Sequence, residues 1–238
     1  MQARLDVGAV ISRVFAIYVE EAAVLMPAAA AVFVFTGVLS TVLLSAGSGL
    51  AVVALLISLV ATTLFTGMVV QLVADIQDGR RDASAGQLLR AAAPVLGQLI
   101  LVGIVAGVGV LIGFILVIVP GLILITIWSV AAPVVVLERP AGLGALARSR
   151  ALVRGNGWQV FGVIFLLDIL VALVAGAIEL GADSAGTGVG IVVRVLVGVL
   201  TAPLSALAAA VLYFDLRGIS AAEPTGGVPT VAGPTDTA

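Results

Sequence analysis

The chain contains neither histidine nor cysteine, so its candidates for chemistry are a few carboxylates, arginines and hydroxyls. The absence of these two residue types excludes disulfides, thiolate chemistry, zinc sites built on them and every histidine-based catalytic triad. The sequence also offers no nucleophile beside a base and no cluster with metal-ligand spacing. We therefore expect a protein that is not an enzyme and that carries no cofactor or metal.

One carboxylate lies deep inside an apolar stretch. Asp168 comes about ten residues into a predicted membrane span over 159–180, which places it near the bilayer midplane at about 1.5 Å per residue. A charge there costs roughly 2.5–3.5 kcal/mol on insertion scales, so Asp168 is expected to face the bundle interior or to be neutral. Two interpretations stay open: a proton or cation relay, or a carboxyl that bonds to a hydroxyl and joins two helices.

A polar segment between two apolar stretches carries three arginines, which are Arg148, Arg150 and Arg154. If this segment is helical, Arg150 and Arg154 share one face and Arg148 lies on the other. One set is then suited to bind lipid phosphate, and the other to pair with an acid such as Glu138 or Asp215. The alternative is that these arginines only mark the cytoplasmic side of the membrane.

A further ionic candidate is expected near the opposite face of the membrane. Arg194 falls at about the same level as Glu179 and Asp183, one on each side of a glycine-rich turn. An ion pair of Arg194 with either acid is the simplest way to satisfy this lone cation at the outer face.

The amino-acid composition indicates what kind of protein carries these residues. Hydrophobic residues make up 62% of the 238 residues, charged residues only 10%, and the mean hydropathy is +1.31. Soluble domains carry roughly 25% charged residues, so the chain is expected to be an integral membrane protein. The apolar runs are continuous rather than alternating, which favours an all-α fold over a β-barrel. No extended basic patch is present, and nucleic acid is not an expected partner.

The apolar stretches predict six transmembrane helices in a membrane domain over 1–218. The expected elements are an amphipathic helix over 3–20 and spans over about 22–44, 50–74, 95–119, 121–137, 159–180 and 191–214. The third and fourth spans are expected to turn at Pro120-Gly121. The first apolar run starts only after Glu20-Glu21, so no cleavable signal peptide is expected. The proline-containing tail over 219–238 is expected to be disordered.

The arginines predict the orientation of this bundle. With both termini inside, all of the 11 basic residues except Arg194 fall on the cytoplasmic side. Basic residues are retained on that side during insertion, so we expect a multi-pass protein of the bacterial inner membrane with both termini in the cytoplasm.

Two pairs of glycines in the third span have the spacing of helix-packing motifs. They are Gly103 with Gly107 and Gly109 with Gly113. In lipid, small residues allow close approach of two helix backbones. The pairs are therefore interpreted either as a dimer face or as the contact with the following span.

Several short motifs together resemble a known bacterial family. They are Pro120-Gly121, Trp128, the segment 133–138 (PVVVLE), the segment 145–149 (ALARS), the segment 152–155 (LVRG), Trp158 and the segment 212–217 (LYFDLR). This order is similar to the membrane domain that is fused to some glycerophosphodiester phosphodiesterases and that occurs alone in other bacterial membrane proteins. The resemblance implies a six-helix membrane domain with amphipathic cytoplasmic segments. It does not imply the phosphodiesterase reaction, which belongs to a separate soluble barrel that uses histidine and carboxylates.

These observations predict a non-catalytic membrane domain, either lipid-associated or a scaffold. Its arginine-bearing cytoplasmic face would contact anionic lipid headgroups or a membrane or cytoplasmic protein partner. The alternative function is a small proton- or cation-coupled transporter that uses Asp168.

Overall fold

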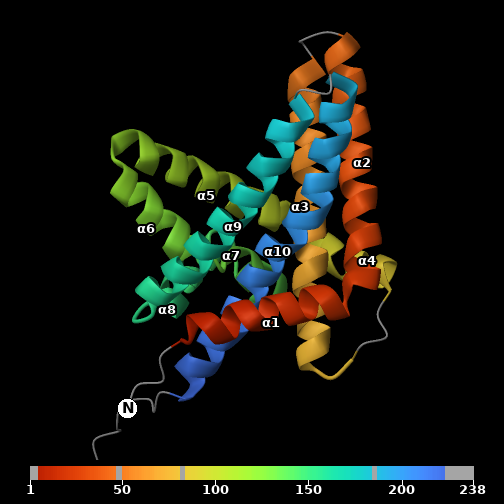
Figure 1. The fold of residues 1–238 in the computed structure, drawn as a ribbon. Coiled ribbons are helices and arrows are strands. Elements are labelled where there is room, and N and C mark those ends of the chain that lie inside the picture. The colour runs from red at the N-terminus through yellow and green to blue at the C-terminus, as the bar shows by residue number, and fades with distance from the viewer. Residues whose placement is uncertain (1–4, 47–49, 81–83, 184–186, 223–238) are drawn as a thin grey trace, which may run out of the picture.

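The computed structural model describes residues 5–46, 50–80, 84–183 and 187–222, and these residues form helices joined by short turns (Figure 1). The helices are α1 (Val7–Glu20), α2 (Ala22–Ala46), α3 (Ala51–Gln77), α4 (Ala85–Ala92), the short 3-10 helix η2 (Ala93–Val95), α5 (Leu96–Leu116), α6 (Ile118–Trp128), α7 (Ala131–Glu138), α8 (Gly144–Val153), α9 (Gly157–Asp183) and α10 (Thr187–Ala222). Within the described residues, six helical segments are long and apolar enough to cross a membrane. This confirms the prediction of an all-α, multi-pass membrane protein.

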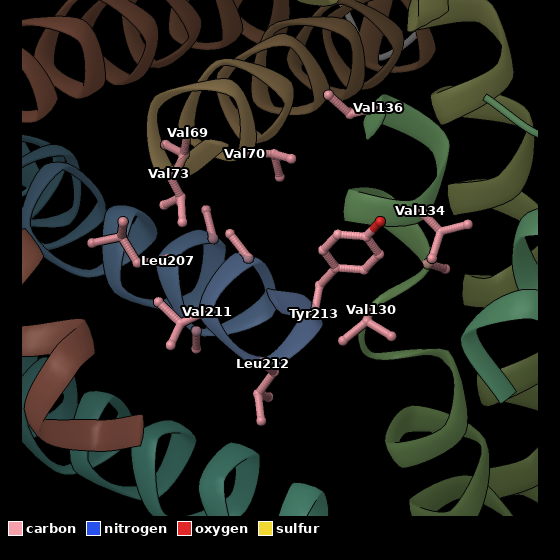
Figure 2. Close-up of a cluster of buried hydrophobic side chains, with 14 of the residues drawn as sticks. Val69, Val70, Val73, Val130, Val134, Val136, Leu207, Val211, Leu212 and Tyr213 are labelled. Carbon is pink, nitrogen blue, oxygen red and sulfur yellow. The ribbon is translucent and has the colours of Figure 1, made fainter. Parts of the chain in front are cut away.

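The long helices α2, α3, α9 and α10 form one bundle, and the hairpin of α5 and α6 leans away from it (Figure 1). α10 is the central element, because it packs against α1, α2, α3, α7, α8 and α9. Its inner face carries fully buried side chains, among them Leu207, Val211, Leu212 and Tyr213. Figure 2 shows Leu207 and Val211 on the side of α10 that faces the valines of α3, and the Tyr213 ring beside Val130 and Val134.

α1 and α8 lie near the same end of the bundle, where the C-terminal part of α10 also ends (Figure 1). We call this the arginine-bearing end; among the described residues it holds Arg13, Arg139, Arg148, Arg150, Arg154 and Arg217. α1 begins with Asp6, whose carboxylate accepts a hydrogen bond from the Ala9 amide at 3.1 Å. α1 is held against α10 by the Arg13–Asp215 ion pair at 2.5 Å.

The predicted turn at Pro120-Gly121 is wrong. α5 ends at Leu116, Val117 is extended, and α6 begins at Ile118, so the proline lies in the first turn of α6. Proline is tolerated there because its missing N–H would have no partner within the helix. Sequence cannot distinguish these positions, since a turn and a first helical turn both accept proline.

The fourth span is broken in its middle, which the sequence did not predict. α6 ends at Trp128 and α7 starts at Ala131, and Pro133 cannot donate the hydrogen bond that would join them. Two hydroxyls bond to carbonyls at the break: Ser129 donates to Thr126 at 2.9 Å, and Ser149 of α8 donates to Ile127 at 2.8 Å. A break in a membrane span requires such partners, because no water is available to replace them.

The C-terminal boundary also differs from the prediction. α10 continues to Ala222, beyond the expected end of the last span at 214 and into the segment that was expected to be disordered. Most of that predicted tail, residues 223–238, lies outside the described residues.

The two glycine pairs of α5 have different surroundings. A Cβ at Gly109 would lie 2.6 Å from the Trp128 ring, and a Cβ at Gly113 would lie 3.0 Å from the Gly121 backbone. This pair therefore permits the close contact of α5 with α6. A Cβ at Gly103 or Gly107 would meet nothing within 4 Å, and both residues are exposed.

The α5–α6 contact predicts opposite effects for the same substitution at two sites. Gly113→Ala forces the two backbones apart and is expected to lower the free energy of unfolding by about 1–3 kcal/mol. Gly107→Ala enters open space and gains roughly 1 kcal/mol of helix propensity, so stability should stay equal or rise. Thermal unfolding of both variants in one detergent measures the difference. Equal destabilisation of the two proteins would contradict this packing.

Candidate functional site

A three-residue polar cluster ties α8 to α7 and α10. The Tyr213 hydroxyl donates to one Glu138 oxygen at 3.0 Å, and Arg148 Nε donates to the other at 2.8 Å. Tyr213 is fully buried, and its ring extends from α10 to the region between Val130 and Val134 (Figure 2). Both carboxylate oxygens of Glu138 therefore have a partner from another helix.

In this cluster Arg148 joins α8 to α7. The hydrogen bond to Glu138 raises the pKa of the Arg148 guanidinium above its ordinary value, so Arg148 keeps its positive charge. The prediction that an arginine of α8 pairs with Glu138 is thus confirmed. The other suggested acid, Asp215, pairs with Arg13 of α1 instead.

Three polar residues that sequence analysis overlooked also hold this end together. Ser149 is completely buried at the break in the fourth span. Gln98 of α5 donates from Nε2 to the carbonyls of Pro140 and Gly142, and buried Asn156 accepts from the Leu5 amide at 3.3 Å. For Gln98 and Asn156 the available signal was their position near the ends of apolar segments, where a buried polar side chain must find a partner within the protein. Ser149 lies between two arginines, and its local sequence gave no such signal.

Arg150 and Arg154 have a different environment from Arg148. Arg150 is in the last turn of α8 and Arg154 follows the end of that helix, and both line a hollow of about 480 Å³ together with Ile127, Ala147 and Gly157. Both are exposed, and neither forms an ion pair with a carboxylate that the structure describes. The predicted separation of Arg148 from Arg150 and Arg154 is therefore present in the structure.

A second hollow of about 450 Å³ adjoins the first between α6 and α9. Its walls include Leu122 and Ile123 of α6 and Phe161 of α9. Its lining side chains carry two polar groups, the indole N–H of Trp158 and the hydroxyl of Thr126, and the hydroxyl already donates to the Leu122 carbonyl at 2.8 Å. The wall is therefore apolar in effect.

The two hollows adjoin each other, because Ile127 and Gly157 line both of them. Trp158 lines the apolar hollow beside this junction and is 83% exposed. Tryptophan prefers the membrane–water interface, which indicates that the junction lies at headgroup depth. We call the two adjoining hollows the amphipathic groove.

Of the two expectations for Asp168, a position facing the bundle interior or a neutral carboxyl, the first does not hold. The inward positions of α9 are taken by Val160, Val163 and Leu167, and Asp168 is exposed on the surface of the helix. No hydrogen bond or ion pair joins Asp168 to another residue in the described part of the chain. The described residues therefore do not form a polar path across the bundle around Asp168.

The expected ion pair at the opposite face cannot be assigned. Arg194 is exposed on α10. The side chains of its proposed partners, Glu179 and Asp183, lie outside the described residues, so this pair stays a prediction.

The chemistry that the arginine-bearing end supports is recognition of an anion. Two guanidinium groups line the same hollow, and no carboxylate is among its lining residues. Guanidinium groups bind phosphate through paired N–H donors, and they keep their charge at any physiological pH. Among the described residues, no group of three acidic side chains could hold a metal ion there.

Comparison with known proteins gives one match. The model of a family described as a domain of unknown function, DUF8558, matches residues 88–216, which is more than half of the chain. The matched region runs from α4 into α10 and includes the whole amphipathic groove. No curated protein and no solved structure matches the chain.

The separation of the arginines predicts different effects on stability. Arg148→Gln removes a partner of Glu138. We expect the free energy of unfolding to fall by no more than about 1 kcal/mol, because the side chains of Arg148 and Glu138 are 44% and 25% exposed. Arg150→Gln removes no bond within the described protein and should leave the unfolding temperature unchanged. Thermal unfolding in detergent compares them. A larger loss for Arg150→Gln would mean that this arginine is the structural one.

Proposed function

We propose a function from the geometry, because this chain belongs to the DUF8558 family, whose function is unknown. The chain is a non-catalytic membrane domain that binds anionic lipid headgroups through Arg150 and Arg154. The observation that carries this proposal is the pair of arginines that line a hollow free of carboxylates. The lack of histidine and cysteine supports a non-catalytic role.

The physical basis is the energy of two charges at a lipid surface. Each arginine near an anionic membrane surface contributes about 1 kcal/mol of attraction, and paired N–H donors add geometric selectivity for phosphate. Arg150 and Arg154 are suited to this role because neither is neutralised by a described carboxylate. Arg148 is less suited, since Glu138 already accepts its hydrogen bond.

The proposal includes an orientation. We place the arginine-bearing end on the cytoplasmic side of a bacterial inner membrane, with both termini in the cytoplasm. The support is the concentration of basic residues at this end, with Arg194 as the exception, which agrees with the retention of positive charge during insertion. The similarity to the membrane domain of glycerophosphodiester phosphodiesterases is compatible with this arrangement and stays a prediction.

The transporter alternative has weaker support. A relay through Asp168 needs neighbouring polar groups that pass a proton or cation across the membrane. Asp168 is instead exposed among apolar residues such as Phe165 and Ile169 on the surface of α9. A protein partner at the arginine-bearing end remains compatible with the lipid-binding role.

Lipid retention after extraction from vesicles tests the proposed function. Protein reconstituted in mixed phosphatidylglycerol and phosphatidylcholine is extracted in mild detergent, and native mass spectrometry counts the bound lipids. The double variant Arg150→Gln with Arg154→Gln should lose about 30-fold in phosphatidylglycerol affinity, from about 1 kcal/mol per arginine.

The control removes the same charge from two arginines outside the hollow. Arg90→Gln with Arg139→Gln changes two exposed arginines that do not line the hollow, and retention should stay close to that of the unmodified protein. Equal loss in both double variants would show general charge attraction and would contradict a defined headgroup site.

A further inference from the structure

We propose that the amphipathic groove holds a single phospholipid molecule, with its phosphate at Arg150 and Arg154 and one acyl chain in the apolar part between α6 and α9. This inference rests on the proposed headgroup binding and extends it to the rest of the ligand. It assigns the ligand class as an anionic phospholipid that enters sideways from the membrane.

The order of surfaces along the groove matches that of a phospholipid. The arginine-lined part ends at Ile127 and Gly157, and the apolar part begins at the same two residues. Trp158 at this junction indicates headgroup depth, so the arginines lie on the aqueous side and Phe161 on the hydrocarbon side. A phospholipid has the same succession of charge and hydrocarbon over the same boundary.

Water is poorly suited to fill the apolar part. It needs two to four polar partners in a buried site, and the lining side chains offer the indole N–H of Trp158 and the hydroxyl of Thr126, which already donates within α6. An empty hollow of about 450 Å³ would leave its lining atoms without contacts. An acyl chain supplies these contacts without leaving unpaired polar groups.

The two parts of the groove have different energetic roles. A chain gains little by moving from bulk lipid into an apolar groove, because both surroundings are equally apolar. Selectivity therefore comes from the guanidinium groups, and the apolar part determines where the chain of the selected lipid lies. The phosphate contact and the chain contact can consequently be tested separately.

Trp158 provides a local reporter of the chain. The protein has two tryptophans, so Trp128→Phe leaves Trp158 as the only one. In this background, phosphatidylglycerol brominated in the half of its chains nearest the headgroup is added as a minor component of phosphatidylcholine bilayers. We expect Trp158 fluorescence to be quenched more than by equally brominated phosphatidylcholine, because the arginines enrich the anionic lipid about 30-fold at the groove.

Gly157 allows the junction to be closed without disturbing the protein. A Cβ at this position would meet nothing within 4 Å, so Gly157→Leu places a side chain in the open space where the two parts join. The matched control is Gly176→Leu, because Gly176 is also in α9 and also has open space beside it. We expect the excess quenching to disappear in the first variant and to persist in the second.

The outcomes separate this inference from the proposed function. If retention depends on Arg150 and Arg154 but both brominated lipids quench equally, the headgroup site stands and the chain site is wrong. Excess quenching that survives Gly157→Leu would also overturn the inference. Quenching by either lipid that falls as the protein-to-lipid ratio rises would mean that a second copy fills the groove. Retention that does not depend on the arginines would overturn both proposals.

Discussion

The arrangement of the arginine-bearing end depends on one buried hydrogen bond between α8 and the break in the fourth span. At the break between α6 and α7, the buried hydroxyl of Ser149 donates to the Ile127 carbonyl at 2.8 Å. A buried carbonyl without a partner costs free energy, so this bond holds α8 beside the break. This position of α8 in turn brings Arg150 and Arg154 to the mouth of the groove beside Ile127.

The same helix combines a structural and a recognition surface. Arg148 and Ser149 bond to α7 and α6, whereas Arg150 and Arg154 point to a hollow without an acidic neighbour. Exposed ion pairs contribute little individually, but Glu138 receives bonds from both Arg148 and buried Tyr213 and so connects three helices. Arg148 therefore helps to hold the fold together, whereas Arg150 and Arg154 stay available to bind a phosphate.

Hydrophobicity and length were sufficient to predict six spans, because crossing a bilayer requires about 20 apolar residues and little else. They could not predict which face of α9 points inward, since a uniformly apolar helix has no amphipathic face, so the choice between an interior and a neutral Asp168 stayed open. The contact of Tyr213 with Glu138 depends on how distant helices align, which no local pattern contains. Pro120 was misplaced because proline suits both a turn and a first helical turn.

The central claim is that phosphate contacts Arg150 and Arg154 and not Arg148. Solid-state NMR can measure it directly through the dipolar coupling between lipid ³¹P and guanidinium ¹⁵N in phosphatidylglycerol bilayers. The account predicts a coupling at hydrogen-bonding distance that is lost when Arg150 and Arg154 are both changed to Gln and that is kept when Arg148 is changed. A coupling that survives the double substitution and disappears with Arg148→Gln would contradict it.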